Sequence, residues 1–210
     1  MAHILITSGP TRQYIDPVRY LTNASSGQMG HCLANACLAS GHEVTIISGP
    51  VSIDYPSNAN IIPVLTTAEM LDAAVSVFSE VDGVIGAAAP CDYTPIVVSD
   101  RKLKKTGEDV TLHLKETPDV IATLGATKAS NQWVVGFALE TDDHRFRALH
   151  KLQAKCCNLI VLNGPTAMNS PNNSIEILDP EGVVIKSFSG TKKDVAVTIL
   201  STIEDYLVEL

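Results

Sequence analysis

The chain has 210 residues, 45% of them hydrophobic, and a formal net charge of −8. This length supports one sizeable core, so we expect a single domain over residues 1–210. The acidic balance argues against a nucleic-acid-binding surface, and no apolar run reaches the length of a membrane span. Five cysteines without metal-ligand spacing, and no apolar leader, favour reduced thiols in a cytoplasmic protein.

Short apolar runs alternate with segments of helical periodicity along most of the chain. We predict buried strands at His3–Thr7, Glu43–Ser48, Ile61–Leu65, Gly83–Ala87, Trp133–Ala138 and Leu159–Leu162. Helices are predicted near Ser26–Ser40, Ala68–Glu80, Pro118–Thr127 and His144–Ala154. Strands joined by crossover helices run parallel. The expected fold class is therefore α/β, a three-layer Rossmann-like (ribokinase-like), mostly parallel sheet with helices on both faces.

Two segments interrupt this alternation. In KLKKTGEDVTLHLKE, residues 102–116, Val110, Leu112 and Leu114 alternate with polar residues after a turn, which predicts a small β excursion with an amphipathic strand. Further on, NSIEILDPEGVVIKSFS predicts a hairpin around Asp179–Gly182. A last helix is predicted at Lys192–Leu207 from its apolar stripe.

Ligands of an open α/β sheet bind beyond the carboxyl ends of the strands, so the residues that follow each strand are informative. The first strand leads into DPVRYLTNASSGQMG, where Ser25, Ser26 and Gly27 precede a helix. Hydroxyls and free N–H groups at a helix start suit a phosphate, and an ordinary serine N-cap would give the same pattern. The G-x-G-x-x-G fingerprint is absent here, which weakens a nicotinamide or flavin dehydrogenase interpretation.

Later strand ends add further candidates. In GAAAPCDYTP, the alanines allow a ribose or planar group to approach the backbone, and Asp92 suits sugar hydroxyls or a metal; tight helix–strand packing is the alternative. In VVGFALETDD, the ring of Phe137 is suited to stack on a nucleotide base; packing in the hydrophobic core is the alternative. The run RKLKK, residues 101–105, and the pair Lys151 and Lys155 are basic clusters that a polyanion needs, although a charge run is also typical of a solvated surface.

These stretches together resemble one known family. TSGPTRQYIDPVRYLTNASSGQMG, AAAPCDYTP followed by RKLKK, ETPDVIATLG, VVGFALETDD and NLIVLNG occur in the same order in phosphopantothenoylcysteine synthetase, also called phosphopantothenate–cysteine ligase. The resemblance covers nearly the whole chain. Many bacteria carry this ligase behind a flavin-dependent decarboxylase. Since no decarboxylase precedes the first strand here, the chain resembles the stand-alone form, and a separate phosphopantothenoylcysteine decarboxylase is a candidate partner.

The resemblance implies a ligase that joins 4′-phosphopantothenate to L-cysteine in coenzyme A biosynthesis. Bacterial members use CTP and Mg²⁺ and pass through an acyl-cytidylate; the metal is expected to bind through the triphosphate, and its protein ligands are not assigned. CTP and ATP both remain open for this chain. The resemblance places the residues that bind the acyl substrate at Arg19, Asn23 and Ala89, beside the turn formed by Ser25, Ser26 and Gly27. It places the residues that bind the nucleotide at Gly86, Ala87, Ala88, Asp92, Lys102, Pro118, Asp119, Val120, Ile121, Phe137, Lys151 and Lys155.

Three residues are expected to act in the chemistry. Lys102, on a flap, would stabilise charge in the first step, and Asn23 would donate to the oxyanion of the second step. Arg19 presents a planar fork suited to carboxylate or phosphate. We expect these loops to form one cleft that is electropositive despite the acidic whole. The resemblance also implies a homodimer in which the flap completes the neighbour's site.

Two departures from the family pattern and two rival functions accompany this hypothesis. Gln28 stands where the family commonly has Lys, and Pro90-Cys91 gives APCD in place of AVAD. One rival is a nicotinamide- or flavin-binding oxidoreductase. The other is a nucleotide sensor that binds CTP without catalysis.

Overall fold

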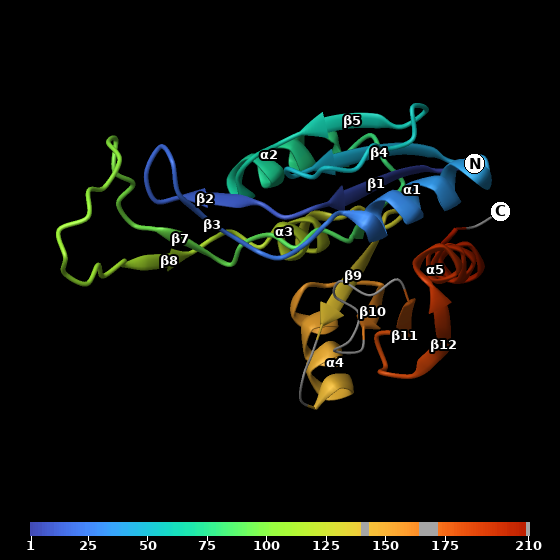
Figure 1. Cartoon of the computed structure of the whole chain (residues 1–210). Helices are drawn as coiled ribbons and strands as arrows, with labels where there is room; N and C mark the ends of the chain where they lie inside the picture. The colour runs from blue at the N-terminus through green and yellow to red at the C-terminus, as the bar shows by residue number, and fades with distance from the viewer. Residues whose placement is uncertain (140–142, 164–171, 209–210) are drawn as a thin grey trace.

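The structure is a computed structural model that describes residues 1–139, 143–163 and 172–208. Within these ranges, eight strands pair into one sheet in the order β12–β11–β10–β9–β6–β1–β4–β5 (Figure 1). The parallel strands are β1 (His3–Ser8), β4 (Glu43–Ser48), β5 (Asn60–Pro63), β6 (Gly83–Gly86), β9 (Trp133–Leu139) and β10 (Leu159–Asn163). Strands β11 (Asn172–Leu178) and β12 (Val184–Thr191) continue the sheet antiparallel.

Helices cover both faces of this sheet. Helices α1 (Gln28–Ala39) and α5 (Lys192–Leu207) pack on one face, and α2 (Thr67–Phe78), α3 (Val120–Thr127) and α4 (His144–Ala154) pack on the other. The buried strand β1 divides its side chains between the two layers, because Ile4 and Ile6 join the first core while Leu5 joins the second. The predicted three-layer, mostly parallel α/β fold is confirmed.

Helices α1 and α4 begin differently from the other three, because their N-cap residues, Gly27 and Asp143, have a positive φ and form no side-chain cap. The side chains of Thr66, Asp119 and Thr191 cap α2, α3 and α5 by accepting a backbone N–H of the first turn. The N-cap of α1 is Gly27, which has a φ of +75° and offers no side-chain cap. The expected alternative of an ordinary serine N-cap is therefore wrong. A residue with a side chain would be strained at this φ, and its Cβ would lie 2.8 Å from a methyl carbon of Val51.

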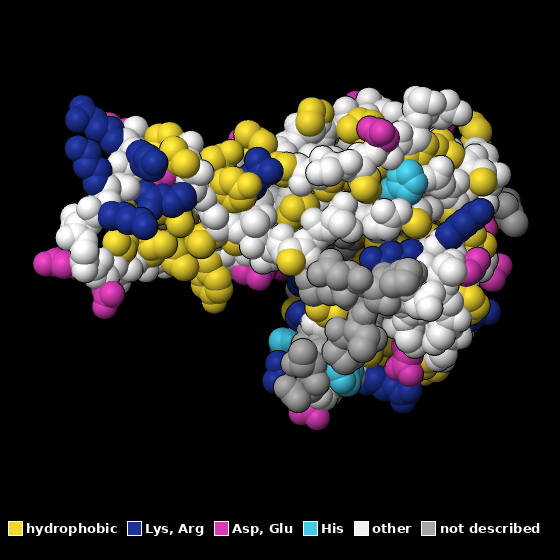
Figure 2. Space-filling model, viewed as in Figure 1, with side chains coloured by type: hydrophobic (Ala, Val, Ile, Leu, Met, Phe, Trp, Pro, Cys, Tyr) yellow, Lys and Arg dark blue, Asp and Glu magenta, His cyan; other side chains and the backbone are white. Residues whose placement is uncertain are grey.

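Two short ribbons form an arm that projects from the sheet (Figure 1). One ribbon pairs β2 (Arg12–Tyr14) with β3 (Tyr20–Thr22), and the other pairs β7 (Tyr93–Pro95) with β8 (Leu114–Glu116). Lysines and arginines gather at the far end of the arm (Figure 2). Several apolar side chains of the arm are exposed, among them Val97 at 79% and Val110 at 68%.

The buried carboxylate of Asp16 holds the arm together. It accepts hydrogen bonds from the backbone N–H groups of Val18 and Arg19, both at 2.8 Å, and of Leu103 at 3.1 Å. The Arg19 guanidinium also donates to it, with Nε at 2.9 Å. Burial by itself would raise the pKa of Asp16, but these hydrogen bonds outweigh burial and lower it well below the usual value of 3.8.

Most predicted elements are confirmed to within two residues at each end, including the hairpin, where Gly182 donates to the Asp179 carbonyl at 3.0 Å. The amphipathic strand predicted at Val110–Leu114 is wrong. Only residues 114–116 of that segment form a strand, and Val110 and Leu112 are exposed and unpaired in any ladder. An alternating segment forms a strand only where it can pair with the edge of another strand. In the arm that partner is β7, which is three residues long. Strands β2, β3 and β7 were not predicted.

The described part of the chain contains no helix with the length and apolar character of a membrane span. All five cysteines are free, and Cys37, Cys91 and Cys157 are buried. Burial and the nearby Glu204 raise the pKa of Cys37 to about 12. Burial likewise raises the pKa of Cys157 to about 11. The prediction of reduced, mostly buried thiols agrees with this arrangement.

Candidate active site

A cavity of about 300 Å³, here called the strand-end cavity, lies beyond the carboxyl ends of β1, β6 and β9. This is the point where the chain, after running from β1 to β5 in one direction, returns to place β6 on the other side of β1. Ligands of open α/β sheets bind at such a switch point. Nine of the predicted nucleotide-binding residues line the cavity, namely Gly86, Ala88, Asp92, Pro118, Asp119, Val120, Ile121, Phe137 and Lys155.

Asp119 and Lys155 form an ion pair at the rim of the strand-end cavity, with Lys155 Nζ 3.0 Å from Asp119 Oδ2. Asp119 is fixed because its other carboxylate oxygen accepts the Ala122 N–H at the start of α3, at 3.0 Å. Lys155 follows the last turn of α4, where its carbonyl packs against Gly125. A Cβ on Gly125 would lie 1.9 Å from that carbonyl oxygen, so only glycine allows this approach. Both charged groups are thus placed by helix ends.

The charge of the strand-end cavity differs from the expected electropositive cleft. Within one subunit it contains the carboxylates of Asp92, Glu116 and Asp119, and among the described lining residues Lys155 is the one ammonium group. That expectation is therefore wrong for a single chain. A polyanion bound here would need further positive charge from outside this cavity.

A second cavity of about 210 Å³, the helix-start cavity, adjoins the first and shares Ala88 and Phe137 with it. It contains the Ser25, Ser26 and Gly27 turn, together with Ala87, Ala89 and Gln28. Side chains beneath the turn hold it in place, because Ser8 Oγ donates to the Gly27 carbonyl at 3.3 Å and Tyr55 donates to Ser8 Oγ at 2.8 Å.

Three polar residues of the helix-start cavity were not predicted, namely Asn163, Asn173 and Lys192. Asn173 is buried and donates to Asn163 Oδ1 at 2.9 Å, while its own Oδ1 has no partner among the described residues. Asn163 directly follows a predicted strand, so the rule used for the other strand ends would have found it. Asn173 and Lys192 reach the cavity through the antiparallel extension of the sheet, which carries no signal of function in the sequence.

A third cavity of about 310 Å³, the ribbon cavity, lies where the β2–β3 ribbon meets the sheet. It shares Ala24, Ser25 and Ser26 with the helix-start cavity, and Asn23 forms part of its wall. Asn23 Nδ2 donates to the Pro90 carbonyl at 2.9 Å, which orients the amide beside Ala89. Pro90, one of the departures from the family pattern, thus contributes its carbonyl to this contact.

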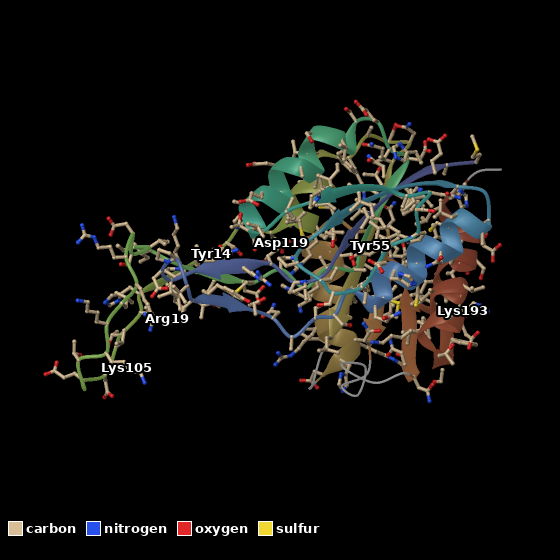
Figure 3. The ribbon with its side chains drawn as sticks, turned by 45° about the horizontal axis from the view of Figure 1, so that its top comes forward. Tyr14, Arg19, Tyr55, Lys105, Asp119 and Lys193 are labelled. Carbon is tan, nitrogen blue, oxygen red and sulfur yellow. The ribbon has the colours of Figure 1, made fainter. Side chains whose placement is uncertain are left out.

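Two predicted catalytic residues lie elsewhere. Arg19 is on the arm, bonded to Asp16 and to the Leu103 carbonyl, and Lys102 precedes Leu103 in the same segment. Figure 3 shows Arg19 and Lys105 at the end of the arm, away from Asp119. Lys151 lies in the last turn of α4 and is not among the residues that line the strand-end cavity. Residues 140–142, part of the VVGFALETDD stretch, lie outside the described residues.

Comparison with known proteins identifies the family. The family described as DNA/pantothenate metabolism flavoprotein C-terminal domain matches residues 1–207. The chain belongs to this family. A curated relative, the coenzyme A biosynthesis bifunctional protein CoaBC of Bacillus subtilis (strain 168), is 43% identical over 206 residues, covering 96% of this chain and 50% of that protein. The resemblance found in the sequence is confirmed at the level of the family.

Two further matches show how much of a longer protein corresponds to this chain. A protein named cysteine/cysteine sulfinic acid decarboxylase, from an unknown prokaryotic organism, is 43% identical over 205 residues, covering 95% of this chain and 57% of that protein. The crystal structure of the C-terminal domain of a CoaBC protein is 38% identical, with a TM-score of 0.83, and the match covers 97% of this chain and 94% of that one. The chain thus spans about half the length of the curated relatives it matches.

Proposed function

We propose that this protein joins 4′-phosphopantothenate to L-cysteine through an acyl-nucleotide intermediate, as a step of coenzyme A biosynthesis. The observation that carries the proposal is the convergence of nine predicted nucleotide-binding residues on the strand-end cavity, in a chain of the same family as the C-terminal domain of CoaBC. CTP is the favoured nucleotide from the sequence resemblance. The phosphates would extend from the strand-end cavity into the adjoining helix-start cavity.

The chemistry explains why this arrangement is needed. A carboxylate repels an attacking amine and has no good leaving group, so it must first be activated. In the first step its oxygen attacks the α-phosphate and pyrophosphate leaves. In the second step the amine of cysteine attacks the acyl carbon, and the nucleoside monophosphate leaves with the electron pair of the broken C–O bond. Each step moves negative charge, so positioning and fixed positive charge supply most of the catalysis.

The described residues divide this work among them. Lys155 and the backbone N–H groups at the start of α1 would hold phosphate oxygens. Lys155 would then exchange part of its contact with Asp119 for the triphosphate. Asn23 would donate an N–H to the oxyanion of the second step, because its amide is neutral and already oriented by Pro90. Ala88 and Ala89 keep the backbone open beside the reacting groups.

Magnesium fits the chemistry of the strand-end cavity. Mg²⁺ is usually held by one or two carboxylates together with substrate phosphates, and Asp92 and Asp119 both line the cavity. Among the described residues, no cluster of three or more His, Cys, Asp or Glu side chains forms a protein-only metal site. A bound Mg²⁺ would neutralise part of the triphosphate charge.

The acidic lining also gives a reason for a homodimer. Lys102 and Arg19 lie on an arm that projects from its own subunit, and the arm exposes apolar side chains including Ile96, Val97 and Val98 (Figure 2). Packing of this arm against a second subunit would cover those side chains and deliver basic groups to the neighbour's cavity. Sedimentation of the full chain at increasing concentration tests this proposal, because a monomer at every concentration would contradict it.

The most direct test of function is pyrophosphate release. The protein would be incubated with 4′-phosphopantothenate, Mg²⁺ and each of the four nucleoside triphosphates in turn, and cysteine would be added afterwards. We expect pyrophosphate with CTP before cysteine is present, and phosphopantothenoylcysteine with CMP after it is added. A sensor would bind CTP without releasing pyrophosphate. A nicotinamide or flavin enzyme would instead be purified with a coloured or fluorescent cofactor.

A further inference from the structure

One face of the β2–β3 ribbon presents a cation to the ribbon cavity. In this antiparallel pair Arg12 lies opposite Thr22 and Tyr14 lies opposite Tyr20, so these four side chains share a face. The guanidinium carbon of Arg12 lies 4.5 Å from the centre of the Tyr20 ring. The opposite face points into the body, where Gln13 Nε2 donates to Thr67 Oγ1 at 2.9 Å. The ribbon is therefore anchored on one side and open on the other.

Arg12 lacks a carboxylate partner of the kind that Arg19 and Arg145 have. Arg19 is paired with Asp16, and Arg145 is paired with Glu176. Across the described ranges, no carboxylate lies within ion-pair distance of Arg12. Its guanidinium is stabilised by the Tyr20 face, a contact that leaves its N–H donors available. In a chain with a net charge of −8, an arginine in this state is suited to an anionic ligand.

The position of the ribbon cavity narrows the choice of ligand. Its wall includes Asn23, the residue proposed to act in the second step, and it shares only the Ala24–Ser26 segment with the helix-start cavity. A molecule in the ribbon cavity would thus approach the acyl group from the side that the nucleotide does not occupy. An amine held there could reach the acyl carbon without displacing the nucleotide.

We propose that the ribbon cavity binds the amino acid substrate and that Arg12 binds its α-carboxylate. This inference rests on the proposed function and assigns the site of the second substrate. Thr22 donates its own hydrogen to the Thr11 carbonyl at 2.8 Å, so its oxygen remains an acceptor for the amine. The rings of Pro10, Tyr20 and Pro50 supply apolar surface for the CH₂–SH group.

A carboxylate suits this cavity better than the phosphate of 4′-phosphopantothenate does. The planar fork of one arginine matches a carboxylate, whereas a phosphate dianion is usually held by several donors. Among the described residues that line the ribbon cavity, Arg12 is the one cationic side chain. The sequence resemblance, moreover, places the acyl substrate on Arg19.

The test uses cysteamine, which has the amine and thiol of cysteine without the carboxylate. The acyl-nucleotide is formed first with 4′-phosphopantothenate and CTP, and its consumption by each amine is then measured. For Arg12→Gln we expect kcat/KM for cysteine to fall by about 10- to 100-fold, with cysteamine turnover and pyrophosphate release unchanged. Arg12→Lys should lose less, because it keeps the charge but not the fork. Arg147→Gln, an exposed arginine of α4 outside these cavities, is the control.

The possible failures are distinguishable. Equal losses for cysteine and cysteamine, or a native enzyme that does not distinguish them, would overturn the carboxylate assignment. A higher requirement for 4′-phosphopantothenate during pyrophosphate release would show that Arg12 binds phosphate, which also overturns it. If Arg12→Gln does not fold, Arg12→Lys provides the same comparison. A native protein that releases no pyrophosphate with any nucleotide refutes the proposed function itself.

Discussion

The sheet and the arm contribute to the site in different ways. The strand-end cavity takes most of its residues from β1, β6, β9 and β10 and from the ends of α3 and α4, which are held by buried cores on both sides of the sheet, while Tyr93 of β7 and Glu116 of β8 reach it from the arm. The arm has short ribbons, exposed apolar side chains and one buried carboxylate, and it carries Arg19 and Lys102. Under the proposed function, the sheet would bind the nucleotide, and the arm would supply positive charge for the chemistry from Arg19 and Lys102.

Among the substitutions proposed here, we expect one on the arm to have the largest effect on the reaction rate. Lys102→Gln should slow acyl-nucleotide formation by about a hundred-fold or more, because it removes a charge that acts in the transition state. Nucleotide affinity, measured by titration calorimetry, should change little, since Lys102 is not among the residues of the strand-end cavity. Lys193→Gln, an exposed lysine of α5, is the control (Figure 3). Normal turnover of Lys102→Gln would mean that Lys102 has no catalytic role.

The complementary substitution replaces a lysine that lines the strand-end cavity. Lys155→Gln should weaken nucleotide binding by about 10- to 100-fold, because a charged hydrogen bond to phosphate is lost. Asp119 would also lose its ion-pair partner, but it remains the N-cap of α3, so the fold should be retained. Titration calorimetry and thermal unfolding separate the two effects. Unchanged affinity would place the triphosphate elsewhere.

Glycines in the two regions should differ in their effect on stability. Gly125→Ala places a Cβ 1.9 Å from the Lys155 carbonyl oxygen, which requires the backbone to move and should cost about 1–3 kcal/mol of unfolding free energy. Gly107 lies on the arm with open space around it and a φ of +91°, so Gly107→Ala should cost only about 1 kcal/mol. Urea unfolding of both variants measures the difference. Equal costs would indicate that the α3–α4 contact is not rigid.

The smallest effect concerns the pH dependence of the arm. Because the pKa of Asp16 is lowered in the folded protein, its ionised form stabilises the arm above the unfolded value of 3.8, and this stabilisation is lost as the pH falls below it. The protection factors of the Val18 and Leu103 amides, which are their hydrogen-exchange rates relative to the intrinsic rate at each pH, should therefore be high at neutral pH and fall in acid. Asp16→Asn should exchange faster at neutral pH and show less acid dependence. The exposed Asp109→Asn should behave like the native chain.

Much of the sheet could be predicted because its elements carry their own signals. Buried parallel strands such as 3–8 and 159–163 are nearly continuous apolar runs, and the last helix has an apolar stripe. The arm could not be predicted in the same way. Strands β2, β3 and β7 have three residues each, and their pairing depends on distant anchors such as the Arg12 N–H bond to the Leu65 carbonyl. The alternation at Val110 and Leu112 had no such partner and gave no strand.

The candidate site shows the same difference between features set by local sequence and features set by tertiary structure. The sequence determined the sheet, its strand ends and the family, because hydrophobic periodicity and local motifs are properties of contiguous residues. Only the tertiary structure decided that Asp119 meets Lys155, that Asn173 lies beside Asn163, and that Arg19 and Lys102 lie away from their own subunit's cavity. These relations join segments that are far apart in the chain, and they are set by packing and by the shape of the arm.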